Sequence, residues 1–179
     1  HAKNIFTDPE MPQALPRRVL ILPCWGKAPV SILRELDGVL AQELGKVNLF
    51  EVGQISSDKV FSRRSDQDFT LEEVKALTRQ AGADGVLTCR VVQCQPYRHM
   101  SLGVAMRLWN IPKEKTVWAA DETLDSQQTV VANGARNYYL TTFRDSYPNR
   151  RSEAILEVPR MFFQYVFDEL LSTLQKTTK

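Results

Sequence analysis

A cysteine and a histidine are the residues of this sequence best suited to covalent chemistry. Cys24 lies just beyond the carboxyl end of the strand expected over 18–23, and open α/β sheets place their ligands at the carboxyl ends of such strands. His99 could follow the third expected strand at the same edge. A thiol and an imidazole make a nucleophile and its base. One interpretation is therefore a cysteine-dependent α/β enzyme that uses Cys24 and His99.

Other features favour a non-catalytic chain. No Asp or Asn is specifically placed to orient His99, and a cysteine in an apolar setting is usually a small core residue. The phosphate-binding patterns G-x-x-x-x-G-K-[ST] and G-x-G-x-x-G are absent from the sequence. Cys24, Cys89 and Cys94 are either three buried thiols or one disulfide and a free thiol. We expect no catalytic residue, no cofactor and no metal site, since two histidines make a metal cage unfavourable.

Size and charge exclude further classes. With 179 residues the chain suffices for one domain with a core. The 23 basic and 21 acidic residues are spread along the sequence, so we expect no nucleic-acid partner, because such binders concentrate basic residues on one face. No apolar run approaches the ~20 residues that a membrane-spanning helix needs.

The elements that must position Cys24 can be read from apolar periods. A continuous apolar run predicts a strand buried on both faces, and alternation predicts strands with two different faces. After the first strand, leucines recur at helical spacing, which predicts an amphipathic helix that ends at Gly45. The expected strands are 18–23, 49–52, 85–92, 102–109 and 116–124.

Two further helices are expected. Thr70 and Glu73 fit a capping box at the start of one. The other covers 155–174, where Pro159 either starts or kinks it. A polar loop is expected over 56–68, and the weak pattern at 126–151 suggests irregular structure with a possible tight turn at Asn133–Gly134.

These elements predict an α/β fold with a single mixed sheet of about five strands flanked by helices. Right-handed crossovers give the spatial order 2-1-3-4-5 with the first three strands parallel. Residues 1–17 are polar and contain Pro9, Pro12 and Pro16, so an extended N-terminal linker is expected there. Residues 18–179 are expected to form one α/β domain.

The order of short motifs resembles a bacterial envelope family, that of the amino-terminal domain of TolB, LpoB and CsgG. The motifs are VLILP at 19–23, LFEV at 49–52, ADGVL at 83–87, MRLWN at 106–110 and TVW at 116–118. Each is weak alone, and their order and spacing carry the resemblance. Cys24, Cys89 and Asn110 depart from the usual residues at their positions.

The resemblance implies a non-catalytic periplasmic lipoprotein that is tethered to the outer membrane by an anchor upstream of residue 1. Such a module binds other cell-envelope proteins, or further copies of itself, as an accessory to an assembly or secretion machine. A secretion pore fits less well, because the region around Asn133 lacks the sustained alternation of membrane strands.

The stretch from Arg136 to Tyr147 is the expected partner-binding segment. Tyrosine and arginine are favoured at the centres of interfaces, and this stretch gathers them outside the periodic core pattern. The alternative is that its rings cover an edge of the sheet. The expected partner-binding residues are Arg136, Tyr138, Tyr139, Arg144 and Tyr147.

Overall fold

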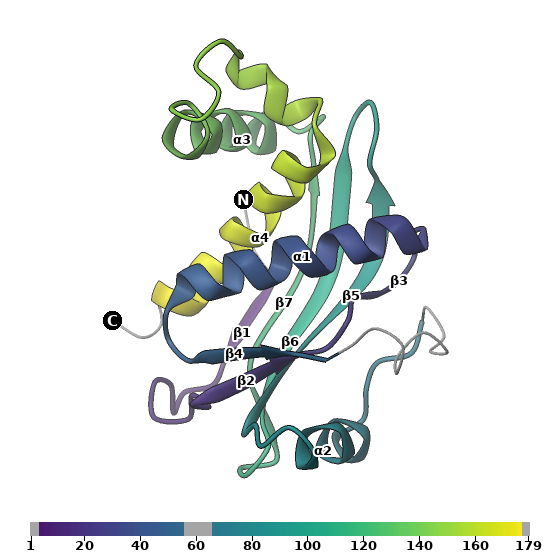
Figure 1. Ribbon diagram of the computed structural model, residues 1–179, viewed down its shortest axis with the longest axis vertical. Coiled ribbons are helices and arrows are strands. Elements are labelled where there is room, and N and C mark those ends of the chain that lie inside the picture. The colour runs from purple at the N-terminus through teal and green to yellow at the C-terminus, as the bar shows by residue number, and fades with distance from the viewer. Residues whose placement is uncertain (1–3, 56–65, 177–179) are drawn as a thin grey trace.

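The computed structural model describes residues 4–55 and 66–176, so the polar loop expected over 56–68 lies mostly outside the described residues. The strands are β1 (Ile5–Thr7), β2 (Arg18–Ile21), β3 (Trp25–Gly26), β4 (Glu51–Gln54), β5 (Gly85–Gln95), β6 (Ser101–Asn110) and β7 (Lys115–Asp125). The helices are α1 (Val30–Val47), α2 (Leu71–Arg79), α3 (Thr129–Thr142), the 3₁₀ helix η2 (Ser152–Leu156) and α4 (Pro159–Lys176). Figure 1 shows their arrangement.

All described strands belong to one mixed sheet with the order β1-β7-β6-β5-β2-β4, and β3 pairs with β5. The five expected strands are β2, β4, β5, β6 and β7, and they keep their predicted neighbours. The pairs β2–β4 and β2–β5 are parallel, while β5–β6 and β6–β7 are antiparallel. The prediction of about five strands is wrong in number, and the complete order differs because β1 and β3 are added.

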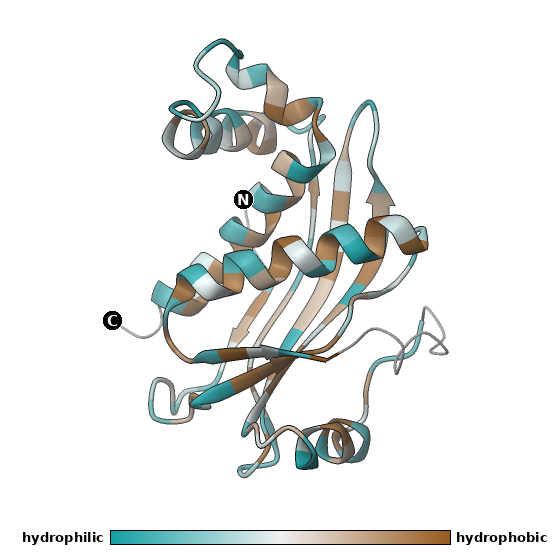
Figure 2. Cartoon of the chain, viewed as in Figure 1, coloured by the Kyte–Doolittle hydropathy of each residue, from teal (hydrophilic) through white to brown (hydrophobic). Residues whose placement is uncertain are grey.

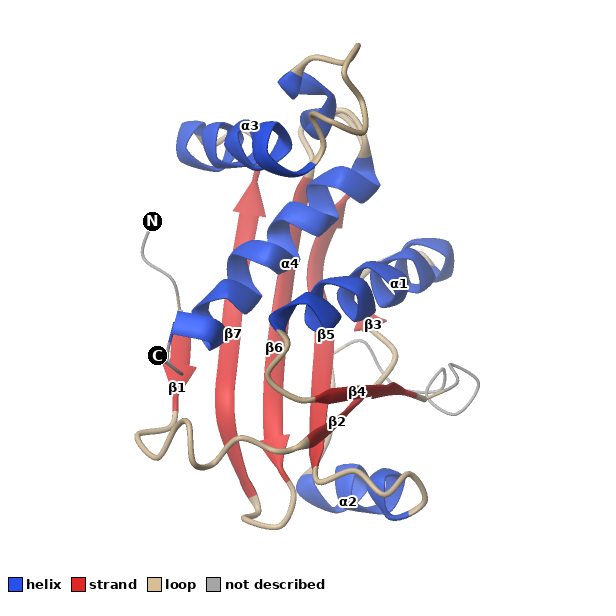
Figure 3. Ribbon diagram, turned by 60° about the vertical axis from the view of Figure 1, so that its left-hand side comes forward, coloured by secondary structure: helices blue, strands red, loops and turns tan. Residues whose placement is uncertain are grey.

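Helices cover the two faces of the sheet unequally. Helices α1 and α4 cross one face, while α3 lies at one end of the sheet and α2 near the other (Figure 3). Alternate residues of β2 explain the division, since Val19 and Ile21 belong to the core under α1 and α4, whereas Leu20 packs with Val74 of α2. A strand between two layers must be apolar on both sides. Apolar bands alternate with polar ones along the helices (Figure 2).

The amino-terminal residues differ from the expected linker. Strand β1 pairs antiparallel with β7, placing Phe6 opposite Ala119. Met11 and Ala14 are buried in the core, and the Ala14 carbonyl accepts a hydrogen bond of 2.7 Å from Asn110 Nδ2. Polar composition and prolines suggested an extended tether, but two buried apolar side chains and a strand edge with free hydrogen-bonding groups hold residues 4–17 on the domain.

The helix boundaries follow their capping residues. The capping box of α2 is confirmed, because Thr70 Oγ1 accepts from the Glu73 amide and the Glu73 carboxylate accepts from the Thr70 amide. Helix α1 continues past Gly45 and ends at Asn48, whose φ of 55° is left-handed. Asparagine tolerates this conformation better than most residues. Pro159 begins α4, as one of the two expectations had it.

The tight turn suggested at Asn133–Gly134 is wrong, because both residues lie inside α3. Val131, Ala135 and Tyr139 recur at four-residue spacing and bury one side of that helix. A Cβ at Gly134 would collide with the Tyr165 hydroxyl of α4. Glycine is therefore kept at this position because α3 and α4 approach each other closely.

Candidate functional site

The expected partner-binding residues lie on α3 and in the turn that follows it, at one end of the sheet (Figure 1). The structure brings their rings together in a chain. Tyr139 and Phe143 have ring centroids 5.9 Å apart, and those of Phe143 and Tyr147 are 6.4 Å apart. Tyr138 contacts Phe143 and also Tyr165 of α4, both at 5.8 Å.

Tyr139 has a structural role in this cluster. It is 1% exposed, and its hydroxyl donates to the carbonyls of Tyr147 at 3.3 Å and Arg150 at 3.5 Å. These bonds hold the turn after α3 against the helix. Tyr139 was expected to contact a partner directly, and its burial excludes that role in this conformation.

Tyr138 and Arg136 are partly covered. Burial, followed by the Glu43 and Asp168 carboxylates, raises the pKa of Tyr138, which keeps the phenol neutral. Arg136 donates through Nη1 to Asn133 Oδ1 at 3.1 Å, and its Nε lies 3.6 Å from Glu153 Oε1 of η2. Both side chains therefore join α3 to the neighbouring helices.

Arg144 and Tyr147 face solvent. Tyr147 is 43% exposed and Leu140 is 48% exposed, and the Arg150 guanidinium lies 5.5 Å from the Tyr147 ring centroid. We call Leu140, Arg144, Tyr147 and Arg150 the outer α3 surface. It combines apolar, aromatic and cationic side chains, which is the composition favoured at the centres of protein interfaces. Leu140 was not among the expected residues, although its place between the tyrosines and Arg144 is visible in the sequence.

The structure places Cys24 and His99 too far apart for the expected nucleophile and base. Cys24 precedes β3 and lies beside Cys89 of β5, whereas His99 is exposed in the turn after Gln95. The rise along a strand separates Cys89 from Gln95 by about 20 Å. The contact with Cys89 and burial raise the pKa of Cys24 well above its ordinary value, whereas a nucleophilic cysteine needs a lowered one. These two residues do not form a catalytic pair.

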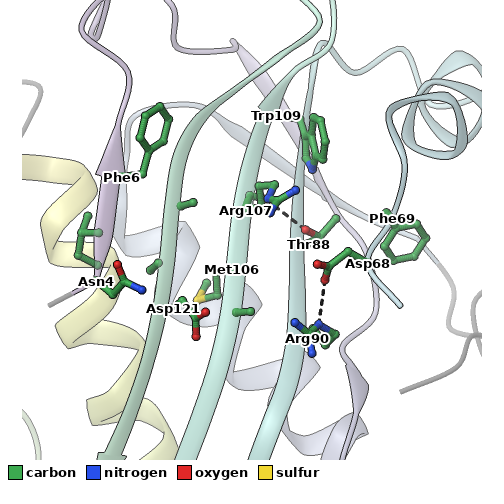
Figure 4. A pocket seen from close by; sticks show the side chains of 14 residues that line it. Asn4, Phe6, Asp68, Phe69, Thr88, Arg90, Met106, Arg107, Trp109 and Asp121 are labelled. Atoms are coloured by element: carbon green, nitrogen blue, oxygen red, sulfur yellow. Dashed lines mark hydrogen bonds and ion pairs between the residues drawn. The ribbon is translucent and has the colours of Figure 1, made fainter. Parts of the chain in front are cut away.

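A second candidate site lies on the sheet face away from α1 and α4. It is a pocket of about 220 Å³ at the middle of β5, β6 and β7 (Figure 4). Ala105 and Ala119 line it together with larger side chains, which include Phe6, Phe69 and Trp109. Small side chains beside aromatic and arginine side chains leave room for a hollow on this face.

The polar groups of this pocket include two arginines and two carboxylates. Arg90 Nε pairs with Asp68 Oδ1 at 2.8 Å, the Arg107 guanidinium lies 5.5 Å from the Trp109 ring centroid, and Asp121 lines the opposite wall. This pocket was missed from the sequence. The only indication in the sequence was the alternation of Ala105, Arg107 and Trp109 along β6. It predicted a second face of the strand, but it did not show that no helix covers that face.

Among residues 4–55 and 66–176, no three His, Cys, Asp or Glu side chains come close enough to hold a metal ion together. Within the same ranges, no helix has the length and hydropathy to cross a bilayer.

Comparison with known proteins finds no matching family model and no matching curated sequence. Among solved structures, a PelC dodecamer from Paraburkholderia phytofirmans matches with a TM-score of 0.60 at 15% identity, over 97% of this chain and 96% of that one. The two chains share a fold. The hypothetical protein CT253 from Chlamydia trachomatis matches with a TM-score of 0.52 at 17% identity, over 90% of this chain and 98% of that one.

Lipoprotein GNA1162 from Neisseria meningitidis aligns with 75% of this chain and all of its own at 14% identity, with a TM-score of 0.44. The expected resemblance to envelope lipoproteins of the TolB, LpoB and CsgG kind is confirmed at the level of the fold. The match to PelC covers 97% of this chain and so extends beyond the expected domain over 18–179.

Proposed function

We propose that this chain is a non-catalytic protein of the bacterial periplasm that acts by binding proteins, and that copies of it associate through the outer α3 surface. A lipid anchor upstream of residue 1 tethers it to the outer membrane, where it serves an assembly or secretion machine. The fold shared with PelC, known as a dodecamer, supports association between copies. The envelope motifs at 19–23 and 106–110 support the compartment.

The exposed apolar side chains at the end of α3 carry the proposal. Leu140 and Tyr147 each expose more than two fifths of their surface, although burying such side chains on a partner is favourable by about 25 cal/mol per Å². Tyr139 holds the turn that presents Tyr147, so little ordering is needed when a partner binds. A presented surface of this kind suits contact with a second rigid copy.

Charge also favours a second copy as the occupant. Arg150 and Arg151 lie with Glu153 and Glu157 around a hollow of about 500 Å³ beside η2. Arg144 on one copy can face a glutamate of the next, while Tyr147 enters the hollow. Such a contact joins Arg144 and Tyr147 of one copy to the hollow of the next, with Arg150 at the border between the two. It is heterologous, and heterologous contacts close into a ring when the rotation between copies closes.

Sedimentation tests this proposal. We expect the unchanged chain to sediment as oligomers whose fraction rises with concentration, and Leu140→Gln combined with Tyr147→Ala to shift it to monomers with an unchanged melting temperature. Tyr97→Ala is the matched control, because Tyr97 is an exposed aromatic residue that belongs to the turn between β5 and β6 and not to the outer α3 surface. A monomer at every concentration, or an oligomer unaffected by the double substitution, contradicts the proposal.

A further inference from the structure

Cys24 and Cys89 lie side by side on neighbouring strands. Strand β3 pairs parallel with β5, with Trp25 opposite Arg90, and the two cysteines precede those residues by one position each. The backbone is fixed on both sides of Cys24. The Leu22 amide donates to the Leu87 carbonyl at 3.1 Å, and the Lys27 amide donates to the Val91 carbonyl at 2.8 Å.

Glycine at position 26 allows this close pairing. A Cβ there would collide with the Val91 carbonyl oxygen, and the φ of 122° is one that other residues rarely adopt. On the other side, the Cys24 amide donates to Asp37 Oδ1 of α1 at 2.6 Å. The position of Cys24 against β5 is therefore held from both directions.

The two thiols are in contact with each other inside the core. Cys24 is 2% exposed and Cys89 is fully buried, and both belong to the cluster under α1 and α4. Their side chains are within hydrogen-bonding reach. Neighbouring positions on paired strands have Cα atoms about 5 Å apart, which is within the span that a disulfide bridges.

Cys94 is too far away to join either of them. It follows Cys89 by five residues along β5, which places it about 16 Å further on. It is half-buried, and burial raises its pKa to about 11. The sequence allows three possible disulfides among its three cysteines, and the geometry permits only the one between Cys24 and Cys89.

We propose that Cys24 and Cys89 form a disulfide when the chain folds in an oxidising compartment, with Cys94 remaining a thiol. This inference rests on the proposed periplasmic location for its occurrence in the cell, while the chemistry can be tested without it. The oxidant is a disulfide R–S–S–R, either a small molecule or a thiol oxidoreductase. One cysteine thiolate attacks it and releases one R–SH, and the second cysteine then displaces the other R–SH. Two thiols become one disulfide, and two R–SH leave.

Burial fixes when this reaction occurs. In the folded chain an external disulfide cannot reach either sulfur, and the raised pKa of Cys24 keeps its thiol protonated. Oxidation therefore precedes the packing of α1 over β5. Once formed, the bond is protected by the same packing, so reductant acts on it only after unfolding.

Thiol counting after refolding tests the pair. The Cys94→Ser chain is denatured, reduced and refolded with oxidised and reduced glutathione, then denatured without reductant and treated with iodoacetamide. We expect most molecules to carry no alkyl group, and two alkyl groups when reductant is added before alkylation. The unsubstituted chain should carry one, at Cys94. Peptide mapping should recover the 24–89 linkage, and the oxidised chain should melt at a higher temperature than the reduced one.

Two variants distinguish this result from other pairings. Cys24→Ala and Cys89→Ala, each with Cys94→Ser, should leave one alkylated thiol and no linked peptide. The inference is overturned if the refolded Cys94→Ser chain alkylates at both cysteines without reductant, or if Cys94 is found linked in the unsubstituted chain. A monomer with the 24–89 disulfide would refute the proposed association and leave this inference standing.

Discussion

The two faces of the sheet differ most clearly along β6. Leu108, Met106 and Val104 point toward α1 and α4 and are buried, while their neighbours Arg107 and Ala105 line the open pocket. Both sets share one backbone, since successive side chains of a strand point to opposite faces. The helix-covered face therefore buries only apolar side chains of this part of β6, whereas the open face also accommodates a charged one.

Trp109 and Trp118 illustrate the same division. Trp118 is fully buried on the covered face, where its Nε1 donates to Thr173 Oγ1 of α4 at 3.1 Å. Trp109 lies in the open pocket beside Arg107. Trp118 pairs with Leu108, and Trp109 is the next residue of β6 and so points to the opposite face. These residues therefore contribute to different surfaces although they are close along the hairpin.

The largest effect should come from Leu108, which tests the covered face directly. Leu108→Ala should lower the free energy of unfolding by about 2–5 kcal/mol, because it leaves a cavity under the helices. Arg107→Ala, one residue away on the open face, should cost about 1 kcal/mol or less. Urea denaturation of the two variants measures both values. Equal losses would refute the division between the faces.

A smaller effect is expected from Tyr139, where α3 meets its following turn. Tyr139→Phe keeps the buried ring and removes the hydroxyl that bonds the Tyr147 and Arg150 carbonyls. We expect a loss of about 0.5–1.5 kcal/mol and faster amide exchange at 147–150. Tyr97→Phe in the exposed turn is the control. Unchanged exchange in the Tyr139→Phe chain would show that the turn is held by other contacts.

The smallest effect should come from the ion pair at the rim of the open pocket. Arg90→Gln removes the pair with Asp68, and partly exposed pairs contribute about 0.2–1 kcal/mol. The difference from the unchanged chain should shrink in 1 M salt, because screening weakens exposed pairs. Arg98→Gln, in the exposed β5–β6 turn, should show no such salt dependence. Thermal melts at two salt concentrations measure the effect, and a loss insensitive to salt would indicate packing instead.

The sequence predicted the parts of the fold whose patterns are long and regular. The run at 19–22 identified a central strand, and the alternation over 102–109 identified β6 and its two faces. Strands β1 and β3 have three and two residues, which is too short for any period to be visible. Pairing with β7 and β5, rather than local preference, makes them strands.

Helix α3 shows a different limit. Asn133–Gly134 is a strong local signal for a turn, and it hid the weaker spacing of Val131, Ala135 and Tyr139. Packing against α4 overrode the local preference. The same error left Tyr139 among the exposed interface residues, since a side chain's burial depends on a helix that the sequence did not reveal. The pairing of Cys24 with Cys89 likewise needed the register of β3.

The attachment of β1 to β7 has a consequence for the working range of the molecule. A free segment from residue 4 to residue 17 would extend by roughly 50 Å at full stretch. Such a segment would let the domain move by that distance relative to whatever precedes it. Because β1 is paired and Met11 is buried, residues 4–17 cannot extend in this way. Residues 4–17 therefore move with the domain as one body and add nothing to its reach toward a partner.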